Sequence, residues 1–493
     1  MPQCWHDRVL YVDRHSRATY GQTRELMLRI AAWLNLRSGV LPGQRVALCL
    51  PMGMTAAQVT LGVLAAGASF VPLQFNGPAQ RLNEILTGFE PHLLITTAAM
   101  AGKLGYGKEN APALPVITID PEFESFRQLI DGVKPAAMPA SVDADGMAAV
   151  FFTSGSTGKP KGAMMSFRSS AETAALFADN APLRSDDCTL MLAPLHYASS
   201  LGLYFAIFKG CRSYIASEEE AMFPEVVADI IQREKITVWD GPSSRLRHLV
   251  EAGTLENPDF ASVRYVEFFG EPMPVDALRA AMRLFPNAAF QNTYGSSEAF
   301  WMTRLEVPRE LPHGLEVLSI GKALPCYAVT LRDPDGNEVA SGEVGEICVV
   351  GPVALVGYWK RPDLTAAARL NGIPNSYRTG DLARLAPDGN YYLVGRRDHQ
   401  VKIRGHRFEL GEIEAVVRSH PSVREAVAFL VGEEVHACVQ AEDRNGLTGE
   451  IRTKCARRLP VFARPARIVV MGKFPRLTSG KVDRLALQAA CVG

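Results

Sequence analysis

The sequence has no excess of charge of either sign and no long hydrophobic run. Its 493 residues include 52 Lys plus Arg and 52 Asp plus Glu. Without a net positive charge, broad binding to nucleic acid or to an acidic membrane surface is disfavoured. The longest apolar run, Leu61–Leu73, contains two glycines and is too short to cross a bilayer. The first residues also lack the uninterrupted apolar segment of a signal peptide.

Cysteine is present without a recognisable pattern. The nine cysteines are scattered singly from Cys4 to Cys491, and no C-x-x-C pair occurs. This spacing predicts neither a disulfide framework nor a zinc site, and it fits reduced thiols. Hydrophobic residues make up 47% of the chain and charged residues 21%, which is ordinary for a globular protein with a sizeable core. We therefore expect a soluble, cytoplasmic protein.

Helical and strand-like segments alternate along the first 140 residues. Tyr20–Arg37 has apolar residues at helical spacing, whereas Arg45–Leu50 and His92–Thr96 are short β-rich runs. This alternation predicts an α/β fold around mostly parallel sheets. Met147–Phe152 is continuously apolar and of strand length, which suits a strand buried on both faces. After about residue 320, segments such as Glu343–Val350 are typical of antiparallel strands.

The most informative segment is Thr153–Gly162, TSGSTGKPKG, directly after the Met147–Phe152 strand. Glycines let backbone N–H groups turn toward an anion, hydroxyls add donors and lysines add charge, a combination that suits a triphosphate. It is not a Walker A loop, because Pro160 follows the only Gly-Lys pair. On composition alone, a flexible polar surface loop remains the alternative.

This string resembles the phosphate loop of the adenylate-forming superfamily, which includes acyl-CoA synthetases, luciferases and nonribosomal peptide synthetase adenylation domains. Other segments resemble that family's motifs in the family's order, over about residues 20–487. They are Asn292–Glu298 (NTYGSSE), Gly342–Val350, Gly357–Tyr358, Tyr377–Asp381 (YRTGD), Gly395–Gly405 (GRRDHQVKIRG), Glu409–Glu414 (ELGEIE) and Ser479–Arg484 (SGKVDR).

The resemblance implies a fold and a reaction. The fold would be α/β, with a large N-terminal domain (1–397) of mostly parallel sheets, flanking helices and a β-barrel-like part. A small, mobile C-terminal α+β domain (398–493) would follow. The reaction would join a carboxylate to ATP, giving an acyl-adenylate and pyrophosphate, and a thiol would then attack the adenylate.

The resemblance also assigns residues to the nucleotide. The phosphate loop would comprise Thr153, Ser154, Gly155, Ser156, Thr157, Gly158 and Lys161. Glu298 would bind Mg²⁺, which prefers carboxylate oxygens shared with phosphates. The adenosine would contact Gly270, Glu271, Pro272, Asn292, Thr293, Tyr294, Gly295, Ser297, Asp381 and Arg396. Tyr294 would lie against the adenine and Asp381 would accept hydrogen bonds from the ribose. Ser297 stands where the family usually has Thr.

Three residues near or beyond the expected domain boundary receive roles in the same way. Lys481 would be the main catalytic residue, contacting the substrate carboxylate and the α-phosphate oxygens. Asp398 would be the hinge about which the small domain swings after adenylation. Lys402 would then lie on the face presented for thiol attack.

The acyl pocket departs from the peptide-synthetase pattern. In Pro194–Leu201 (PLHYASSL), His196 and Tyr197 stand where those domains usually carry Phe-Asp, whose Asp holds an α-ammonium. A standard α-amino acid therefore loses its usual anchor, and the pattern is closer to acyl and aryl ligases. His196 is either a catalytic gate of the carboxylate channel or a plain wall residue of the pocket.

A gap-free alignment with the family places Asp240 and Glu267 on strand ends facing the acyl pocket, with Trp239 and Thr293 nearby, and predicts a set of residues around the acyl group. This set consists of Tyr197, Ala198, Leu201, Asp240, Glu267, Phe269, Trp301 and Met302. Burying a carboxylate in an apolar pocket is unfavourable unless it meets a cation. Either Arg245 or Arg264 pairs with one of the two acids, or Asp240 and Glu267 bind a substrate amine distant from the carboxyl group.

The thiol acceptor is the last expectation. QVKIRGHRFELGEIE and SGKVDRLAL resemble adenylation domains that load carrier proteins, and the chain ends 12 residues after Lys481. A fused carrier domain would need far more residues, so we expect a free-standing ligase that loads a separate phosphopantetheinylated carrier protein. The alternative is an acyl- or aryl-CoA ligase. Two other classes are a luciferase-like oxidoreductase and a non-catalytic relative.

Overall fold

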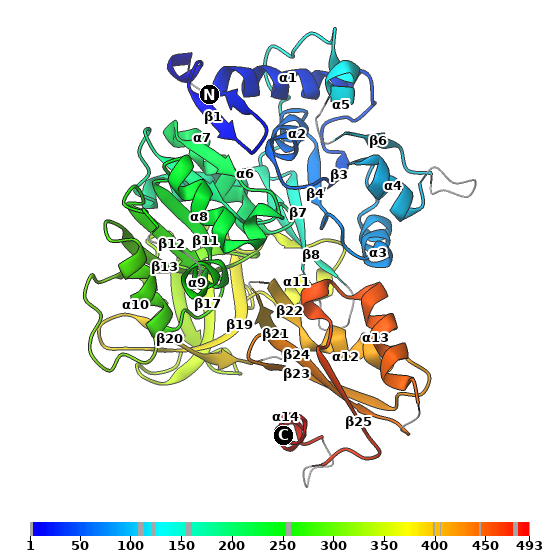
Figure 1. Cartoon of the computed structure of the whole chain (residues 1–493), viewed down its shortest axis with the longest axis vertical. Coiled ribbons are helices and arrows are strands. Elements are labelled where there is room, and N and C mark those ends of the chain that lie inside the picture. Colours follow the sequence, from blue (N-terminus) through cyan, green and yellow to red (C-terminus); the bar gives the residue numbers. More distant parts are fainter. Residues whose placement is uncertain are drawn as a thin grey trace. The chain divides into compact units, whose positions relative to one another are not determined.

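The chain divides into two compact units. The larger comprises Met1–Phe75, Glu90–Phe151 and Ala163–Arg397, and the smaller comprises Asn76–Phe89, Phe152–Gly162 and Asp398–Gly493. This computed structural model describes residues 3–106, 113–120, 124–153, 160–252, 258–397, 400–404, 406–442, 445–476 and 482–492. Figure 1 shows the elements in chain order.

A seven-stranded sheet contains most of the strands expected in the first part of the chain. Its order is β18 (Gly357–Tyr358), β8 (Lys161–Ser166), β7 (Met147–Thr153), β4 (Ser69–Pro72), β3 (Arg45–Cys49), β5 (Leu93–Thr96) and β6 (Val116–Thr118). Strands β7, β4, β3, β5 and β6 are parallel. The accompanying helices are α1 (Tyr20–Leu36), α2 (Met54–Ala65), α4 (Ala98–Leu104), α5 (Glu124–Ile130) and α11 (Pro362–Ala367). The interior of β7 is buried, as its apolar run predicts.

A nine-stranded sheet forms the second layer of the larger unit. Its order is β15 (Lys322–Ala323), β14 (Phe300–Val307), β13 (Ala289–Ser296), β12 (Tyr265–Phe269), β11 (Val238–Pro242), β9 (Cys188–Met191), β10 (Arg212–Ile215), β1 (Val9–Val12) and β2 (Arg17–Thr19). The six strands from β13 to β1 are parallel. The helices after β8 are α6 (Phe167–Asn180), α7 (Gly202–Lys209), α8 (Pro224–Arg233), α9 (Ser243–Glu251) and α10 (Val275–Leu284).

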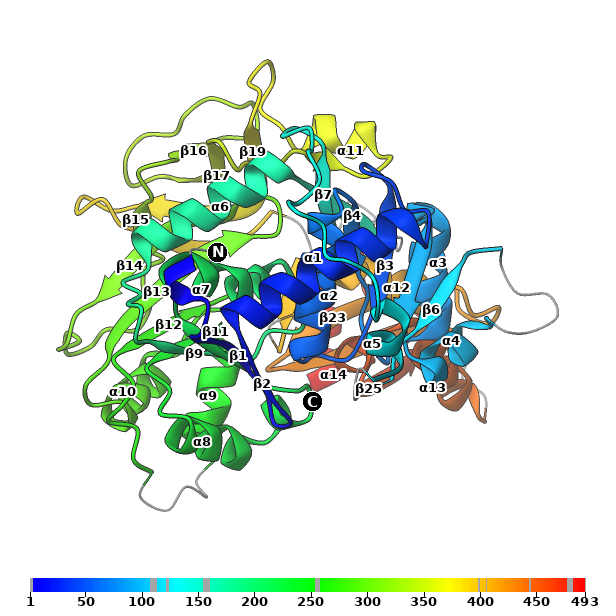
Figure 2. The same ribbon diagram turned by 90° about the horizontal axis from the view of Figure 1, so that it is seen from above.

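The two faces of this sheet are covered differently. Figure 2 shows α8, α9 and α10 on one side of it, and α6 and α7 on the other. Leu190, Trp239 and Val266 pack in one apolar cluster with residues of α8, α9 and α10. Because side chains alternate between the faces of a strand, the residues next to these three point toward α6 and α7. That second face carries the polar groups described below.

The part expected to resemble a barrel is a four-stranded antiparallel sheet. Its order is β16 (Ala328–Arg332), β17 (Val344–Val350), β19 (Ser376–Leu385) and β20 (Tyr391–Arg396). Glu346 of β17 accepts hydrogen bonds from the guanidinium groups of Arg378 and Arg397. This sheet therefore holds one of its buried acids with two cations.

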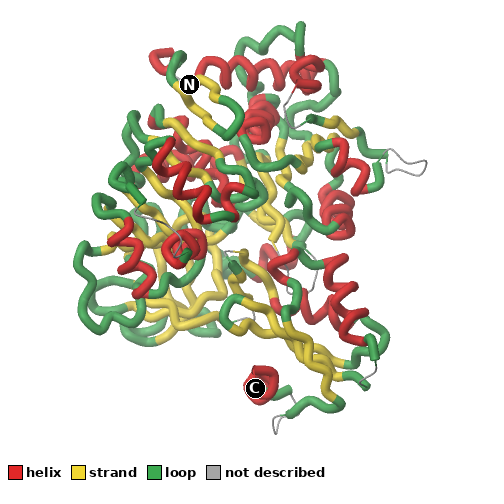
Figure 3. The backbone as a smooth tube through the Cα atoms, viewed as in Figure 1, coloured by secondary structure: helices red, strands yellow, loops and turns green. Residues whose placement is uncertain are grey.

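The smaller unit is α+β, and its main sheet has a different partner on each face. The unit contains α3 (Ala79–Phe89), β21 (Gln400–Ile403), β22 (His406–Glu409), α12 (Leu410–Arg418), β23 (Glu425–Val431), β24 (Glu434–Gln440), α13 (Leu447–Arg458), β25 (Arg467–Met471) and α14 (Arg484–Val492). Ala426 and Ala428 face the cluster that includes α12 and α13. Val427 and Phe429 face Leu487 of α14 on the opposite side. Figure 3 shows this sheet with helices on both sides.

Two cysteines differ from the expectation of free thiols. Cys438 of β24 and Cys491 of α14 form a disulfide, whereas seven other cysteines are free. The expectation was wrong for this pair because the two residues are 53 positions apart in sequence. Only the packing of α14 against the sheet brings them together. The cytoplasmic location inferred from the thiols stays a prediction.

In the described part of the chain, no helix is long and apolar enough to span a membrane.

Candidate functional site

The glycine-rich segment connects two neighbouring strands. Thr153 ends β7 and Lys161 begins β8, and the Thr153 hydroxyl donates to the Lys161 carbonyl at 3.5 Å. Lys161 Nζ lies 3.5 Å from Glu409 Oε1, and both residues belong to the smaller unit. The other predicted members of this loop, Ser154, Gly155, Ser156, Thr157 and Gly158, lie outside the described residues.

Asp381 is held from two sides by residues predicted to contact the adenosine. The hydroxyl of Tyr294, on β13, donates to Asp381 Oδ2, and the guanidinium of Arg396 donates to Oδ1. Arg396 also donates to the Thr379 carbonyl at 3.1 Å. Burial and the neighbouring Asp381 carboxylate raise the pKa of Tyr294 well above its usual range, so the phenol keeps its proton. The carboxylate is therefore fixed in position.

Glu298 is buried, with 4% of its surface exposed. The hydroxyl of Tyr358 donates to Glu298 Oε1 at 2.8 Å, which orients the carboxylate. Ser297 precedes it and is half-buried. Within the described ranges, no group of three or more His, Cys, Asp or Glu side chains is arranged to hold a metal ion. One buried carboxylate still fits Mg²⁺, because that ion usually takes one or two protein carboxylates together with phosphates and water.

The other predicted adenosine residues lie on neighbouring strands. Asn292, Thr293, Tyr294 and Gly295 belong to β13, and Gly270, Glu271 and Pro272 directly follow β12. The hydroxyl of Ser243 donates to the carbonyls of Phe269 and Glu271, at 3.2 and 2.9 Å. Gly270 has a φ of +93°, which glycine adopts without strain. The turn is thus held by the first residue of α9, directly after the end of β11.

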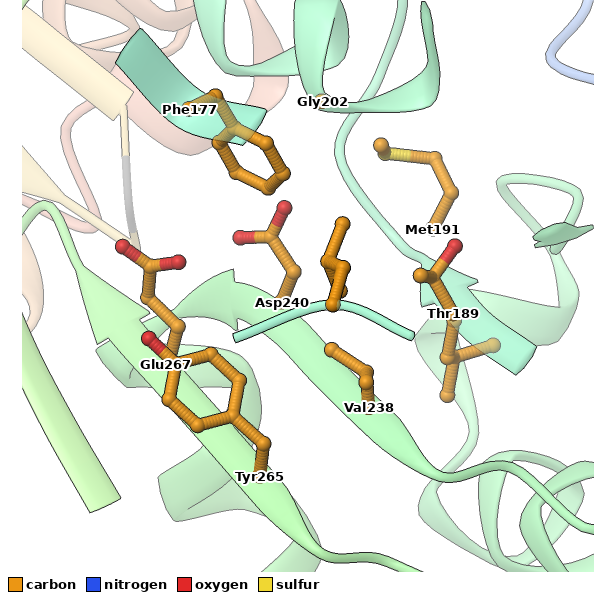
Figure 4. A pocket seen from close by; sticks show the side chains of 10 residues that line it. Phe177, Thr189, Met191, Gly202, Val238, Asp240, Tyr265 and Glu267 are labelled. Carbon is orange, nitrogen blue, oxygen red and sulfur yellow. The ribbon is translucent and has the colours of Figure 1, made fainter. Parts of the chain in front are cut away.

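A row of side chains crosses the nine-stranded sheet beside these loops. Met191, Asp240, Glu267 and Gln291 are register partners on β9, β11, β12 and β13. They therefore share one face of the sheet, the face toward α6 and α7. Asp240 and Glu267 line a small pocket. Figure 4 shows both carboxyl groups on the same side of the strands, toward Phe177 of α6.

The first residue of α7 borders this pocket. Gly202 lines it, and a Cβ atom at Gly202 would lie 2.8 Å from Asp240 Oδ2. Only glycine therefore leaves room above that carboxylate. The ring centroids of His196 and Tyr197 lie 4.2 Å apart, with the rings tilted, and Ala198 and Leu201 are buried in the adjoining apolar cluster. None of these last four is among the residues that line the pocket.

Some residues predicted to line the pocket lie elsewhere. Met302 is fully buried in an apolar cluster with Tyr294 and is not among the residues that line this pocket, so its contact with the acyl group stays a prediction. Its neighbour Trp301 faces the other way and packs on Phe177, with 4.6 Å between ring centroids. Trp239 packs toward α8, α9 and α10. Because side chains alternate along a strand, Trp239 and its neighbour Asp240 lie on opposite faces of the sheet.

Phe269 ends β12, and its backbone pairs with that of Thr293. The hydroxyl of Thr293 donates to Glu267 Oε1 at 2.6 Å. Phe177, Thr189, Val238 and Tyr265 also line the pocket and were missed from the sequence. The strand alternation could have indicated Thr189, Val238 and Tyr265, since each precedes a predicted or register-matched pocket residue by two positions.

The two acids are not paired with an arginine, so the first alternative stated above was wrong. Arg264 instead donates to Asp187 at 2.8 Å, and Arg245 donates to the Ala221 carbonyl at 2.7 Å. Neither Asp240 nor Glu267 makes an ion pair with any described residue. Asp240 Oδ1 is buried without a hydrogen-bond partner in the part of the protein that the structure describes.

Burial changes the titration of both acids. It raises the pKa of Asp240 to about 7. Burial together with the charge of Asp240 raises the pKa of Glu267 to about 8, against the effect of the Thr293 hydroxyl. These directions follow from removing a carboxylate from water and placing a like charge beside it. The pair therefore retains a proton at pH 7.

Comparison with known proteins places this geometry in a family. A family model described as AMP-binding enzyme matches residues 2–359, and one described as AMP-binding enzyme C-terminal domain matches residues 412–481. The chain belongs to the AMP-binding enzyme family. The adenylate-forming family, its fold and its enzyme class are thus confirmed, and ATP is the nucleotide that such enzymes use.

Two similar proteins match along nearly their whole length. An L-proline–[L-prolyl-carrier protein] ligase of Pseudomonas fluorescens is 31% identical over 97% of this chain and 95% of its own. A protein of the same name from Streptomyces coelicolor is 32% identical over 96% of this chain and 92% of its own. Among solved structures, the amide bond synthetase McbA from Marinactinospora thermotolerans has a TM-score of 0.85. It is 23% identical and matches over 98% of this chain and 97% of its own.

Three residues of the smaller unit were also predicted to act in catalysis or domain movement. Lys402 lies on β21 and is half-buried. Asp398 and Lys481 lie outside the described residues.

The burial of Asp240 without a partner for Oδ1 among the described residues predicts an effect on stability. We expect Asp240→Asn to make the ligand-free protein more stable at pH 8, by on the order of 1–3 kcal/mol, because it removes a buried charge that lacks a partner. Folding raises the pKa of Asp240 from an unfolded value near 4, so ionisation destabilises the fold increasingly as pH rises from about 4 toward 7. The gain should therefore vanish near pH 4.

Scanning calorimetry of wild type and Asp240→Asn at several pH values measures this difference. A variant that is less stable than wild type at pH 8 would show that the carboxylate is stabilised by a protein partner.

Proposed function

We propose that this chain activates a carboxylic acid with ATP and Mg²⁺ as its acyl-adenylate and transfers the acyl group to the phosphopantetheine thiol of a separate carrier protein. The observation that supports this best is the full-length similarity to two enzymes named as carrier-protein ligases. From the same similarity we infer a role in natural-product biosynthesis.

The nucleotide is held by groups already oriented in the protein. In-line displacement at the α-phosphate depends on alignment and charge stabilisation more than on acid–base chemistry. Asp381 is fixed by Tyr294 and Arg396, and its carboxylate accepts hydrogen bonds from the ribose hydroxyls. Arg396 already lies beside that carboxylate, where it can reach the ribose and a phosphate oxygen.

The triphosphate charge is countered on two sides. Glu298, oriented by Tyr358, would hold Mg²⁺, which when bound neutralises part of the triphosphate charge. Lys161 and the hydroxyls of the Thr153–Gly162 segment bind the β- and γ-phosphates. Lys481 stabilises the charge that grows between the carboxylate and the α-phosphate in the transition state.

Two measurements test the two halves of the proposal. Pyrophosphate exchange with α-amino, β-amino, cyclic amino, aryl and fatty acids should identify an acid that depends on ATP. Mass spectrometry should then find that acid on phosphopantetheinylated carrier proteins. Exchange with none of the acids would contradict adenylation. Acyl transfer to CoA in preference to every carrier would favour the acyl- or aryl-CoA ligase alternative, with which the His196-Tyr197 pattern agrees.

The role of Lys481 gives a second prediction. Lys481→Ala should lower the rate of adenylation by several orders of magnitude while ATP still binds, because a contact made mainly in the transition state affects turnover more than ground-state affinity. Pyrophosphate exchange and ATP titration measure the two effects. Lys473→Ala removes an exposed lysine eight positions earlier and should change neither. Normal exchange by a folded Lys481→Ala protein would exclude the assignment.

The hinge role of Asp398 gives a third prediction. Asp398→Pro should spare adenylation and abolish thioester formation, because proline fixes φ and blocks the backbone rotation. Asp398→Gly, which leaves the rotation possible, is the matched control and should retain both steps. Equal loss of both half-reactions in the proline variant would mean that residue 398 has a structural role instead.

A further inference from the structure

We propose that Asp240 and Glu267 together bind the ammonium group of the acid that this enzyme activates, so that its substrate is an amine-bearing carboxylic acid. This inference rests on the proposed function and names its substrate class. It depends on four features of the described residues: the register of the two acids, their lack of a protein cation, the space beside them and their titration.

The register holds the two carboxyl groups side by side. Asp240 and Glu267 are direct partners on the parallel strands β11 and β12, whose backbones lie about 4.8 Å apart. Both side chains point to the face of the sheet that α6 and α7 cover (Figure 4). Each is the middle residue of its strand. A single cation placed between them can contact both.

Among the described residues, no Lys, Arg or His forms an ion pair with either acid. Asp240 is 9% exposed and Glu267 is 1% exposed, yet neither forms an ion pair with a described residue. Other buried acids do form ion pairs: Asp187 pairs with Arg264, and Glu346 pairs with Arg378. The unpartnered Asp240 Oδ1 is the clearest mark of a missing ligand, because buried polar atoms in folded proteins nearly always have a hydrogen-bond partner.

The space beside Asp240 is kept open by a glycine. Any side chain at Gly202 would come within 2.8 Å of Asp240 Oδ2, so this position preserves access to the carboxylate. Val238, Met191 and Phe177 supply apolar lining that suits the carbon atoms of a small substrate. The pocket therefore pairs an apolar wall with two acids, which is the arrangement expected for an alkyl ammonium ion.

The charged and titratable groups around the pair agree with a ligand cation. Tyr265, from the same strand as Glu267, keeps its proton because burial and the Glu267 charge raise its pKa well above the usual range. Arg304 of β14 lowers the pKa of Glu267 from a distance, but it makes its ion pair with Glu306. Without ligand the pair retains a proton, and an arriving ammonium ion favours the ionised carboxylates.

Matched substrates and variants test the inference. The measurement is kcat/KM for adenylation of amine-bearing acids against the same acids without the amine, including α-amino, β-amino and cyclic amino acids. Wild type should prefer the amine-bearing member of at least one pair. Asp240→Asn and Glu267→Gln keep the side-chain shape while removing the charge. Each should reduce that preference about 30- to several-thousand-fold, the range for truncating a buried charge-assisted contact.

The deaminated acid provides the internal control, since its kcat/KM should stay near the wild-type value or rise. Glu220→Gln is the matched protein control. Glu220 is also buried, but it accepts hydrogen bonds from the Tyr214 hydroxyl and the Ser217 backbone and does not line the pocket. Its variant should leave the preference unchanged. Circular dichroism confirms that the compared variants are folded.

Three results would overturn the inference while leaving the proposed function intact. One is a wild type that adenylates acids without amines as well as their amine-bearing partners. Another is an unchanged preference in both Asp240→Asn and Glu267→Gln. The third is an equal loss for amine-bearing and deaminated acids, which would show a structural role for the carboxylates. If no acid of the panel supports pyrophosphate exchange, the proposed function itself fails.

Discussion

Burial of two neighbouring carboxyl groups without a cation is the constraint on which the acyl pocket depends. A parallel sheet fixes the two side chains on one face, and the apolar packing of the opposite face against α8, α9 and α10 leaves the strands no freedom to turn them away. Such a pair is unfavourable in the empty protein, because desolvation and mutual repulsion both oppose ionisation. Strain of this kind persists where the surrounding structure determines it, and it is typical of functional sites.

The carboxylates predicted to contact the nucleotide and those predicted to contact the acyl group differ in their hydrogen bonding. On the nucleotide side, Asp381 and Glu298 already receive hydrogen bonds from tyrosine hydroxyls, so these acids are oriented before any ligand arrives. On the acyl side, Asp240 lacks such a donor among the described residues. Because the nucleotide is the same throughout the family, the hydrogen bonds that orient its carboxylates can form before it binds. The group that distinguishes one acid from another is better read by carboxylates that only the right substrate satisfies.

Much of this arrangement could be predicted from the sequence, and the failures have a common physical origin. Local patterns predicted strands such as β3 and β7 within two residues, because their apolar runs and turns are local signals. Asp240 and Glu267 were expected at strand ends facing a pocket; both line a pocket, but they lie in the middle of β11 and β12. Trp239 and Met302 were expected near the pocket and pack in apolar clusters; the side-chain period of two makes the face of a strand residue sensitive to a shift of one position.

Long-range partners were beyond such patterns. The pairing of Arg264 with Asp187 joins residues 77 positions apart, and the Cys438–Cys491 disulfide joins residues 53 apart. Nothing in the local sequence indicates either contact, because each depends on how separate elements pack. The role of Gly202 beside Asp240 is of the same kind. The group that would pair with Asp240 and Glu267 could not be predicted from local sequence either, because it depends on all the residues that line the pocket.

The central claim is that the acid pair holds a proton until a substrate ammonium replaces it. Infrared difference spectroscopy of the carboxyl C=O stretch tests this directly. The account predicts a protonated-carboxyl band in the ligand-free enzyme at pH 7 that is absent from the Asp240→Asn, Glu267→Gln double variant. The band should disappear when the preferred amine-bearing acid binds and should persist with its deaminated analogue. A band that is missing from the free enzyme, or one that the amine-bearing acid leaves unchanged, would contradict the claim.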